Sequence, residues 1–318
     1  MKLARPIALA ALGTLLCSTT AAAQDSPEAQ AQAILKKARD AAGGEAKLKS
    51  IQSLSYNGKS KRMVRMMMMT GGGDSQQQPA PSLQENDFEV DILAPDKYVR
   101  RDTREISNMA ATLITHTGFN GDQLITRREV IGDLPAMPNF GAPPDPAAIV
   151  RRSKQSFLRD WLALGFEPAG AYGVTYRSLG TETVNDATYN VVEATAPDDF
   201  TAKLYFDAST NRLAMMRYRA PGGMQSVRMG GPPPAGAAPG GNPPPQGEGQ
   251  QQRVFQRPAG PMPDVDYEIV YSDYKAVDGV QLPHRFRRSS NGELADETEI
   301  KRYKLNSNPK ADKFKTTD

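Results

Sequence analysis

The sequence of 318 residues contains only two histidines, His116 and His284. Histidine is the usual general base and a common metal ligand, but each of these stands alone in a stretch typical of a β-strand. The two lack the spacing that zinc hydrolases use. We also find no nucleophile elbow, phosphate-binding loop or dinucleotide-binding glycine pattern. The sequence therefore predicts a protein that is not an enzyme and that holds no metal or cofactor.

Acidic and apolar residues alternate over residues 84–93, so a strand there would carry carboxylates on one face. The acidic positions are Glu85, Asp87, Glu89 and Asp91. We expect a solvated sheet face whose partners lie on the next strand, namely Arg100, Arg101 or Arg104. A weak calcium site is the alternative, because hard cations take carboxylate oxygens.

Methionines gather in two of the predicted strands, and their flexible thioether side chains suit a surface that accepts varied apolar ligands. The residues are Met63, Met66, Met67, Met68 and Met69 in or beside one strand, with Met215 and Met216 in another. We predict that Met63, Met66, Met68 and Met215 line a ligand cavity. The alternative is that each is an ordinary core residue.

An internal helix is predicted over residues 146–164, where Asp145 can serve as the N-cap. Its apolar stripe consists of Val150, Phe157, Leu158, Trp161 and Leu162. Such a stripe must face a sheet or a ligand that lies between helix and sheet. We predict that Phe157, Leu158, Trp161 and Leu162 form a wall of the cavity; the alternative is that Trp161 belongs to the core.

The remaining pattern is strand after strand, with turn signals such as Asn57-Gly58 and Asn291-Gly292 between them. Strands are predicted at 51–68, 84–93, 97–106, 110–118, 122–130, 174–181, 187–195, 201–207, 211–219, 265–275, 280–289 and 294–304. This order favours hairpins and a meander over alternating strands and helices. The expected fold class is mainly β with α, a curved antiparallel sheet or incomplete barrel with an N-terminal helix and an internal lid or plug helix.

The first helix is predicted to begin at Ser26-Pro27-Glu28, which reads as an N-cap, a first-position proline and a first-turn acid. Gly43-Gly44 should end it. Its apolar face, which includes Ile34, Leu35, Ala38 and Ala42, should dock on another apolar surface.

The N-terminus resembles a cleavable secretory signal, with Lys2 and Arg5, an apolar run over 7–16, and Ala21-Ala22-Ala23 before Gln24. We predict export to the periplasm with cleavage near Ala23, and a mature chain without a membrane span. Lipid attachment at Cys17 is the alternative, although Leu16 is not the small residue that a lipobox prefers. The mature chain would have no cysteine and a net charge of about +1, which excludes disulfides and gives no nucleic-acid footprint.

Low-complexity stretches at about 70–82 and 221–263 contain too few apolar residues to pack, and 135–146 is punctuated by prolines. Strands flank the longest stretch on both sides. We therefore predict one domain over 24–318 with disordered insertions, the alternative being that 221–263 links two domains.

The two ends of the mature chain resemble the outer-membrane lipoprotein-sorting, or LolA/LolB-like, periplasmic proteins. The resemblance rests on the alanine-rich helix ending in Gly43-Gly44, followed by Leu48, Ile51, Leu54 and Gly58, and on the segment 271–283 with the closing strand through Tyr303. It implies a half-barrel whose helices cover an apolar cavity that receives acyl chains.

The favoured function is accordingly a periplasmic binding or carrier protein for an acyl chain, a lipoprotein or another amphiphile. Its partners would be a lipid, an acylated protein or an envelope protein, with no nucleic acid. The alternative is an envelope sensor or protein-interaction module without a transport role, and an enzyme is the third possibility.

Overall fold

The computed structural model describes residues 25–64, 82–106, 110–133, 145–166, 172–222 and 263–316. The predicted signal peptide, 1–23, lies outside these residues. So do the predicted insertions at 70–82 and 221–263, except for residues at their ends: Ser82 begins a strand, Pro221 ends one, and Gly222 and Pro263 are also described. The prediction of a single domain with two insertions therefore stays a prediction.

The described residues form one 12-stranded sheet in which every neighbouring pair is antiparallel. The strands are β1 (Ser53–Val64), β2 (Ser82–Leu93), β3 (Lys97–Ile106), β4 (Ala111–Asn120), β5 (Gln123–Ile131), β6 (Thr175–Val184), β7 (Ala187–Ala196), β8 (Phe200–Asp207), β9 (Leu213–Pro221), β10 (Asp264–Val277), β11 (Val280–Ser290) and β12 (Glu293–Leu305). The predicted fold class, a curved antiparallel sheet with two helices, is confirmed.

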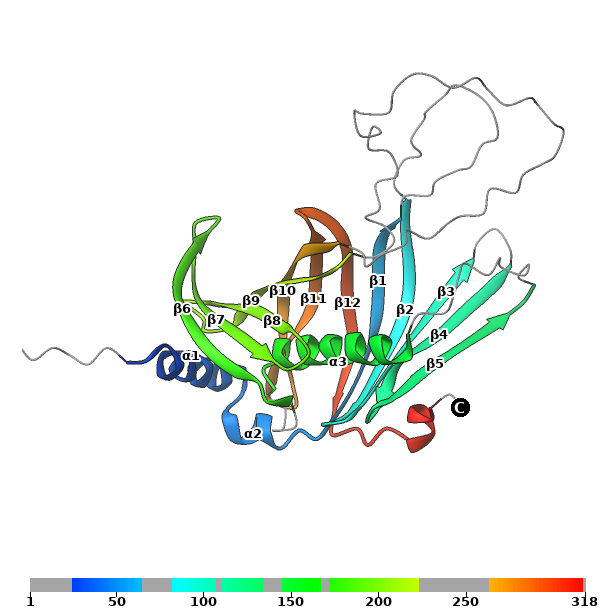
Figure 1. The fold of residues 1–318 in the computed structure, drawn as a ribbon, viewed down its shortest axis with the longest axis horizontal. Helices are drawn as coiled ribbons and strands as arrows, with labels where there is room; N and C mark the ends of the chain where they lie inside the picture. Colours follow the sequence, from blue (N-terminus) through cyan, green and yellow to red (C-terminus); the bar gives the residue numbers. More distant parts are fainter. Residues whose placement is uncertain are drawn as a thin grey trace, which may run out of the picture.

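The sheet consists of two meanders joined side by side. Its strand order is β5-β4-β3-β2-β1-β12-β11-β10-β9-β8-β7-β6, so β1 and β12 form the seam between the meanders. A twisted open sheet of more than about ten strands tends to curl. Figure 1 shows the curved sheet, with β5 and β6 at its two free edges and the helix α3 (Pro146–Ala163) lying across it between them.

Helix α1 (Pro27–Ala42) begins and ends where the sequence predicts. The Ser26 hydroxyl accepts a hydrogen bond of 3.2 Å from the Ala29 amide. Gly43 has φ +132°, and a Cβ there would lie 2.5 Å from the Gly279 carbonyl oxygen. This glycine therefore lets the end of the helix approach the turn between β10 and β11. A short helix that the sequence analysis missed, α2 (Glu45–Lys49), follows it.

Helix α3 is capped by Asp145, whose carboxylate accepts a hydrogen bond of 3.0 Å from the Ala147 amide. Its apolar stripe is buried against the sheet. The ring of Phe157 contacts Tyr98 on β3 and Phe119 on β4, with centroids 6.2 and 5.9 Å apart. We call this side of the sheet the inner face and the opposite side the outer face. Because side chains alternate along a strand, the apolar positions of the inner face build the main core.

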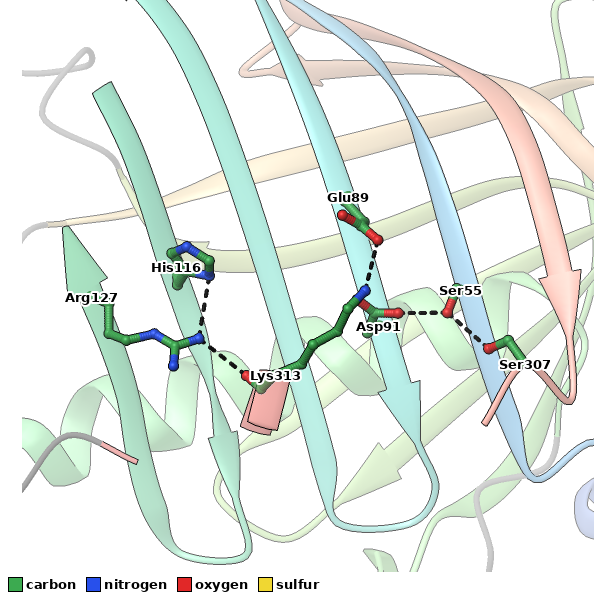
Figure 2. A network of polar contacts seen from close by, with 7 residues as sticks. All are labelled: Ser55, Glu89, Asp91, His116, Arg127, Ser307 and Lys313. Carbon is green, nitrogen blue, oxygen red and sulfur yellow. Dashed lines mark hydrogen bonds and ion pairs between the residues drawn. The ribbon is translucent and has the colours of Figure 1, made fainter. Parts of the chain in front are cut away.

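The C-terminal segment packs on the outer face, as Figure 2 shows. Its 3-10 helix η3 (Ala311–Phe314) was not predicted. Phe314 is buried with Val99 and Ile125. The Lys313 ammonium group lies 2.8 Å from Glu89 and 2.5 Å from Asp91 on β2. The carboxylate of Asp91 also accepts a hydrogen bond of 2.5 Å from Ser55.

The acidic face of β2 lies on the outer face as expected, but its partners differ from those predicted. Glu85 pairs with Lys59, Asp87 pairs with Lys301, and the other two acids pair with Lys313. Arg100 and Arg104 occupy alternate positions on the inner face of β3, where Arg100 binds Asp102. Because side chains alternate between the two faces of the sheet, Arg100 and Arg104 lie on the face opposite to the acids of β2. The predicted cross-strand pairing was therefore wrong for these two arginines.

Candidate functional site

An apolar groove lies where α1 and the C-terminal end of α3 meet over the inner face. We define the apolar groove by its lining residues, Leu35, Ala38, Arg39, Ala42, Leu162, Ala163, Leu164, Gly165, Phe166, Tyr176, Leu204, Phe206, Arg212, Leu213, Tyr274 and Gln281. Helix α1, the end of α3 and strands β6, β8, β9, β10 and β11 all contribute. The groove therefore depends on segments that are far apart in the sequence.

The groove is small, with a cavity volume of about 50 Å³ between these residues, and it is partly open to solvent. On the α1 side its wall is built largely from small residues, Ala38 and Ala42, with Leu35 beside them. On the sheet side, Leu204 and Phe206 of β8 supply apolar surface, and both are buried. A surface of this kind binds a flexible apolar chain by excluding water and requires no chemistry.

Two arginines give the groove a polar border. The guanidinium group of Arg212 lies 5.5 Å from the ring centroid of Tyr274, whose hydroxyl donates a hydrogen bond of 2.5 Å to the Leu213 carbonyl. Arg39 lies 4.0 Å from Glu45. An amphiphile that placed its chain in the groove would meet these charges at its polar end.

Three aromatic rings connect the groove to the core beneath α3. The ring of Phe166, which lines the groove, lies 4.8 Å from that of Trp161, and Trp161 stacks on Phe157 at 5.5 Å. Trp161 is 2% exposed. It is the only tryptophan of the sequence, so its fluorescence reports on this region.

The structure places the predicted α3 residues together. Phe157, Leu158, Trp161 and Leu162 are all buried in the main core, and Leu162 also lines the apolar groove. The first three lie beneath the helix, against the sheet.

The predicted methionines are not brought together with that stripe. Met63 pairs with Leu83, and strand parity places it on the outer face. Met215 packs with Val191 and Tyr205 in a small separate cluster, whereas its neighbour Met216 belongs to the main core. Met66 and Met68 lie outside the described residues.

Sequence reasoning did not assign the α1 residues Leu35, Ala38 and Ala42 to the site, although it predicted that their face docks on an apolar surface. The alternation of Leu204 and Phe206 along β8 was a second available signal. Neither pattern shows that the two surfaces meet, because that depends on how α1 returns across the sheet.

A polar contact fixes α3 to the seam of the sheet. The Tyr56 hydroxyl on β1 donates a hydrogen bond of 3.1 Å to the Asp160 carboxylate. Burial raises the pKa of Asp160, and the opposing effects of Arg100 and of the Tyr56 hydrogen bond are smaller. Beside it, the guanidinium group of Arg159 lies 4.4 Å from the ring centroid of Tyr218.

The two histidines lie on opposite faces of the sheet, in strands β4 and β11. On the inner face, His284 is buried, and its Nδ1 lies 3.0 Å from the Leu282 carbonyl oxygen. On the outer face, His116 has a pKa lowered by burial and by Arg127. Within the described ranges, no three His, Cys, Asp or Glu side chains are grouped to hold a metal ion. Nor does any helix in those ranges combine the length and hydropathy of a membrane span.

No protein-family model matches the sequence, and no curated protein matches it either. Solved structures that are similar include a LolA superfamily protein, NE2245, from Nitrosomonas europaea, with 12% identity, 88% of this chain and 94% of that chain covered, and a TM-score of 0.44. A DUF1329 family protein from Desulfovibrio piger has 10% identity, covers 92% and 98%, and has a TM-score of 0.43.

A third structure, an outer membrane lipoprotein-sorting protein domain from Vibrio parahaemolyticus, has 10% identity, 89% and 97% coverage, and a TM-score of 0.42. Two of the three carry the description that the ends of this sequence resemble. The likeness concerns the fold and says nothing of what this chain binds.

Proposed function

We propose that this protein is a periplasmic binding or carrier protein that holds an acyl chain, or a comparable apolar chain of an amphiphile, in the apolar groove between α1 and α3. The observation that carries the proposal is the groove itself, an apolar surface bordered by charges and built from two helices on one sheet. Each 100 Å² of apolar surface that a chain buries there contributes about 2.5 kcal/mol to binding, before the cost of ordering the chain.

Helix α1 is the element that adapts the groove to its ligand. Small side chains such as Ala38 and Ala42 leave room beside the helix, and Gly43-Gly44 follows it directly. A modest displacement of α1 from the end of α3 widens the groove without breaking the pairing of any strand.

We infer export from the signal-like N-terminus, and export would bring the protein to its ligand in the periplasm. We expect N-terminal sequencing of the protein from an envelope fraction to begin at or near Gln24, without an attached lipid. A mature protein that begins at an acylated Cys17 would instead place the carrier at a membrane surface.

Titration with a dansylated fatty acid tests the groove, because energy transfer from Trp161 to the dansyl group reports binding. The variant Ala38→Phe fills the groove, whereas Ala33→Phe adds the same ring at an exposed position of the same helix. We expect saturable binding by the wild type, weaker binding by Ala38→Phe and unchanged binding by Ala33→Phe. Thermal unfolding of both variants shows whether α1 remains docked.

Native mass spectrometry of the protein recovered from the envelope provides a second test, since a carrier should retain lipid. If the folded, lipid-free protein shows no saturable binding of several acyl ligands, the carrier proposal fails. A stable protein partner without bound lipid would then favour an interaction module.

A further inference from the structure

The inner face changes from apolar to cationic along the strands of its central part. Beyond Tyr56 on β1, the next inner-face positions are Gly58, Ser60 and Arg62. On β3, the inner-face positions after Tyr98 are Arg100, Asp102 and Arg104, as the continuous pairing of β1, β2 and β3 requires. We define the arginine cluster by the side chains of Arg62, Arg100, Asp102, Arg104, Arg288 and Asp296.

One end of the arginine cluster is a row of three charged residues on adjacent strands. Asp296 on β12 stands opposite Arg62 on β1 and also opposite Arg288 on β11. Its carboxylate forms an ion pair with Arg288. Among the described residues Arg62 forms no ion pair, and partial desolvation together with the neighbouring charge of Arg288 lowers the pKa of Arg62. This row therefore carries more positive charge than its acid compensates.

The other end lies on β3. Asp102 binds Arg100 through several hydrogen bonds of 2.8–3.0 Å, which occupies that carboxylate. The Nε atoms of Arg104 and Arg288 and the amide oxygen of Asn86 are buried and have no hydrogen-bond partner within the described chain. A buried donor without a partner is costly, so the two arginine Nε–H groups indicate a position that a hydrogen-bond acceptor on a ligand can satisfy; the Asn86 oxygen is an acceptor and does not bear on an anion.

Aromatic rings hold two of the guanidinium groups in place. The Arg100 guanidinium lies 4.4 Å from the ring centroid of Phe88, and that of Arg288 lies 5.8 Å from the ring centroid of Tyr267. A guanidinium group stacked on a ring can still use its edge for hydrogen bonds, and in Arg100 and Arg288 that edge binds Asp102 and Asp296. The side chains of Arg100 and Arg288 are 31% and 34% exposed, so solvent and solutes reach them.

We propose that the arginine cluster binds an oxyanion of the phosphate class, as free phosphate or as the phosphate group of a larger ligand. Arg62 lies close enough to Arg288 and Arg100 for their charges to act on it. Several neighbouring guanidinium groups match the several oxygens and the double charge of a phosphate. Each of the two aspartates is paired with one arginine, and neither Arg62 nor Arg104 forms an ion pair with another described residue, so their charges are left for the anion. The inference does not depend on the proposed carrier function, because the arginine cluster and the apolar groove have no residue in common.

Isothermal titration calorimetry at low ionic strength tests the proposal with inorganic phosphate, dodecyl phosphate and the uncharged dodecyl maltoside. The test variant is Arg62→Gln/Arg104→Gln. The matched control is Arg285→Gln, which removes an exposed arginine from the outer face of β11, the strand that carries Arg288. Arg62→Gln alone, at an exposed position, serves if the double variant does not fold.

We expect the double variant to bind phosphate at least about tenfold more weakly than the wild type, and the control to bind it equally well. Tighter binding of dodecyl phosphate than of inorganic phosphate would identify a lipid head group as the source of the anion; equal affinity would identify free phosphate or a soluble phosphate ester. If the wild type binds neither, or the double variant binds both as the wild type does, the proposal is wrong. If dodecyl maltoside nevertheless binds the wild type and the arginine variants with equal affinity, the carrier proposal remains valid although the phosphate proposal fails.

Discussion

The hydroxyl of Tyr56 donates a hydrogen bond of 3.1 Å to the carboxylate of Asp160, and this contact joins the strand at the seam of the sheet to the helix that crosses it. Asp160 is a residue of α3 and is partly buried, and this burial raises the pKa of its carboxyl group. The folded protein therefore holds a proton at this carboxyl more tightly than the unfolded chain, in which an aspartate has a pKa of about 3.9.

Replacement of Asp160 by asparagine should change how stability depends on pH. The stability that the protonated carboxyl contributes is fully present below about pH 3.9 and is lost as the pH rises through the raised pKa. The variant Asp160→Asn cannot titrate, so it should gain stability relative to the wild type as the pH rises from about 4 to neutral. Urea unfolding at several pH values measures this difference. A difference that is constant with pH would contradict the shift.

Asp207 provides the opposite case in the turn between β8 and β9. Its carboxylate accepts hydrogen bonds from the hydroxyl and amide groups of Ser209 and Thr210, at 2.6–3.0 Å, and these lower its pKa. The resulting stability is present above the unfolded pKa and is lost as the pH falls through the folded one. In the same unfolding series, Asp207→Asn should therefore gain on the wild type as the pH falls. If the stability of Asp207→Asn relative to the wild type instead rose with increasing pH, as expected for Asp160→Asn, the effect would not arise from the local hydrogen bonds of Asp207.

The C-terminal segment should contribute to stability through Lys313 (Figure 2). The variant Lys313→Met leaves the carboxylate of Asp91, whose side chain is 5% exposed, with the hydroxyl of Ser55 as its remaining partner among the described residues. We expect a loss of about 1–2 kcal/mol, at the lower end for a charged hydrogen bond because Lys313 is 37% exposed. A double-mutant cycle with Asp91→Asn measures the coupling. The control Lys59→Met, which removes a more exposed ion pair with Glu85, should lower the free energy of unfolding by less. A coupling energy near zero between Lys313 and Asp91 would show that Phe314 alone holds the C-terminal segment on the sheet.

The elements of the fold were predictable because strand alternation and helix caps are local signals. The acid-bearing strand β2 and the helix that begins at Pro27 both follow from spacing alone. The pairing of β1 with β12 was not predictable from local signals, since it joins residues separated by most of the chain. The short segments α2 and η3 contain few apolar residues, and their ends are fixed by tertiary contacts.

The candidate site was predictable only in part for the same reason. The stripe of α3 is periodic, so Phe157 and Leu162 could be recognised as facing the sheet. The face of the sheet on which Met215 lies could not be predicted. Alternation along a strand defines two faces but does not indicate which of them packs against the helix. Nothing in the sequence places Arg62 near Arg288, because that neighbourhood arises from the pairing of β12 with both strands.

Gly58 should be required for the seam between the two meanders. It lies beside the register shift of β1 against β12, and a Cβ there would be 2.0 Å from the backbone oxygen of Glu299. Gly58→Ala must therefore displace backbone at the seam, and we expect a loss of at least about 2 kcal/mol. Gly292→Ala, in a turn with open space around it, is the control and should cost about 1 kcal/mol for its positive φ. Equal unfolding midpoints for the two variants would show that the seam adapts without cost.

Trp161 tests whether α3 is a fixed part of the core or a lid that separates from the sheet. Its ring is 2% exposed and lies between Phe157 and Phe166, at 5.5 and 4.8 Å. A fixed helix predicts that Trp161→Ala costs about 3–5 kcal/mol, because it leaves a cavity that rigid neighbours cannot fill. Trp161→Phe should restore part of the loss.

A lid predicts a different pair of results, since a helix that already separates from the sheet loses little when one of its contacts is removed. The stability cost would then fall below about 1 kcal/mol, while binding of the dansylated fatty acid would weaken. Urea unfolding followed by far-ultraviolet circular dichroism measures the first quantity without the tryptophan signal, and direct dansyl excitation measures the second. We expect the large stability cost, because the Tyr56–Asp160 hydrogen bond and the stacked rings hold the same two turns of α3 to the sheet.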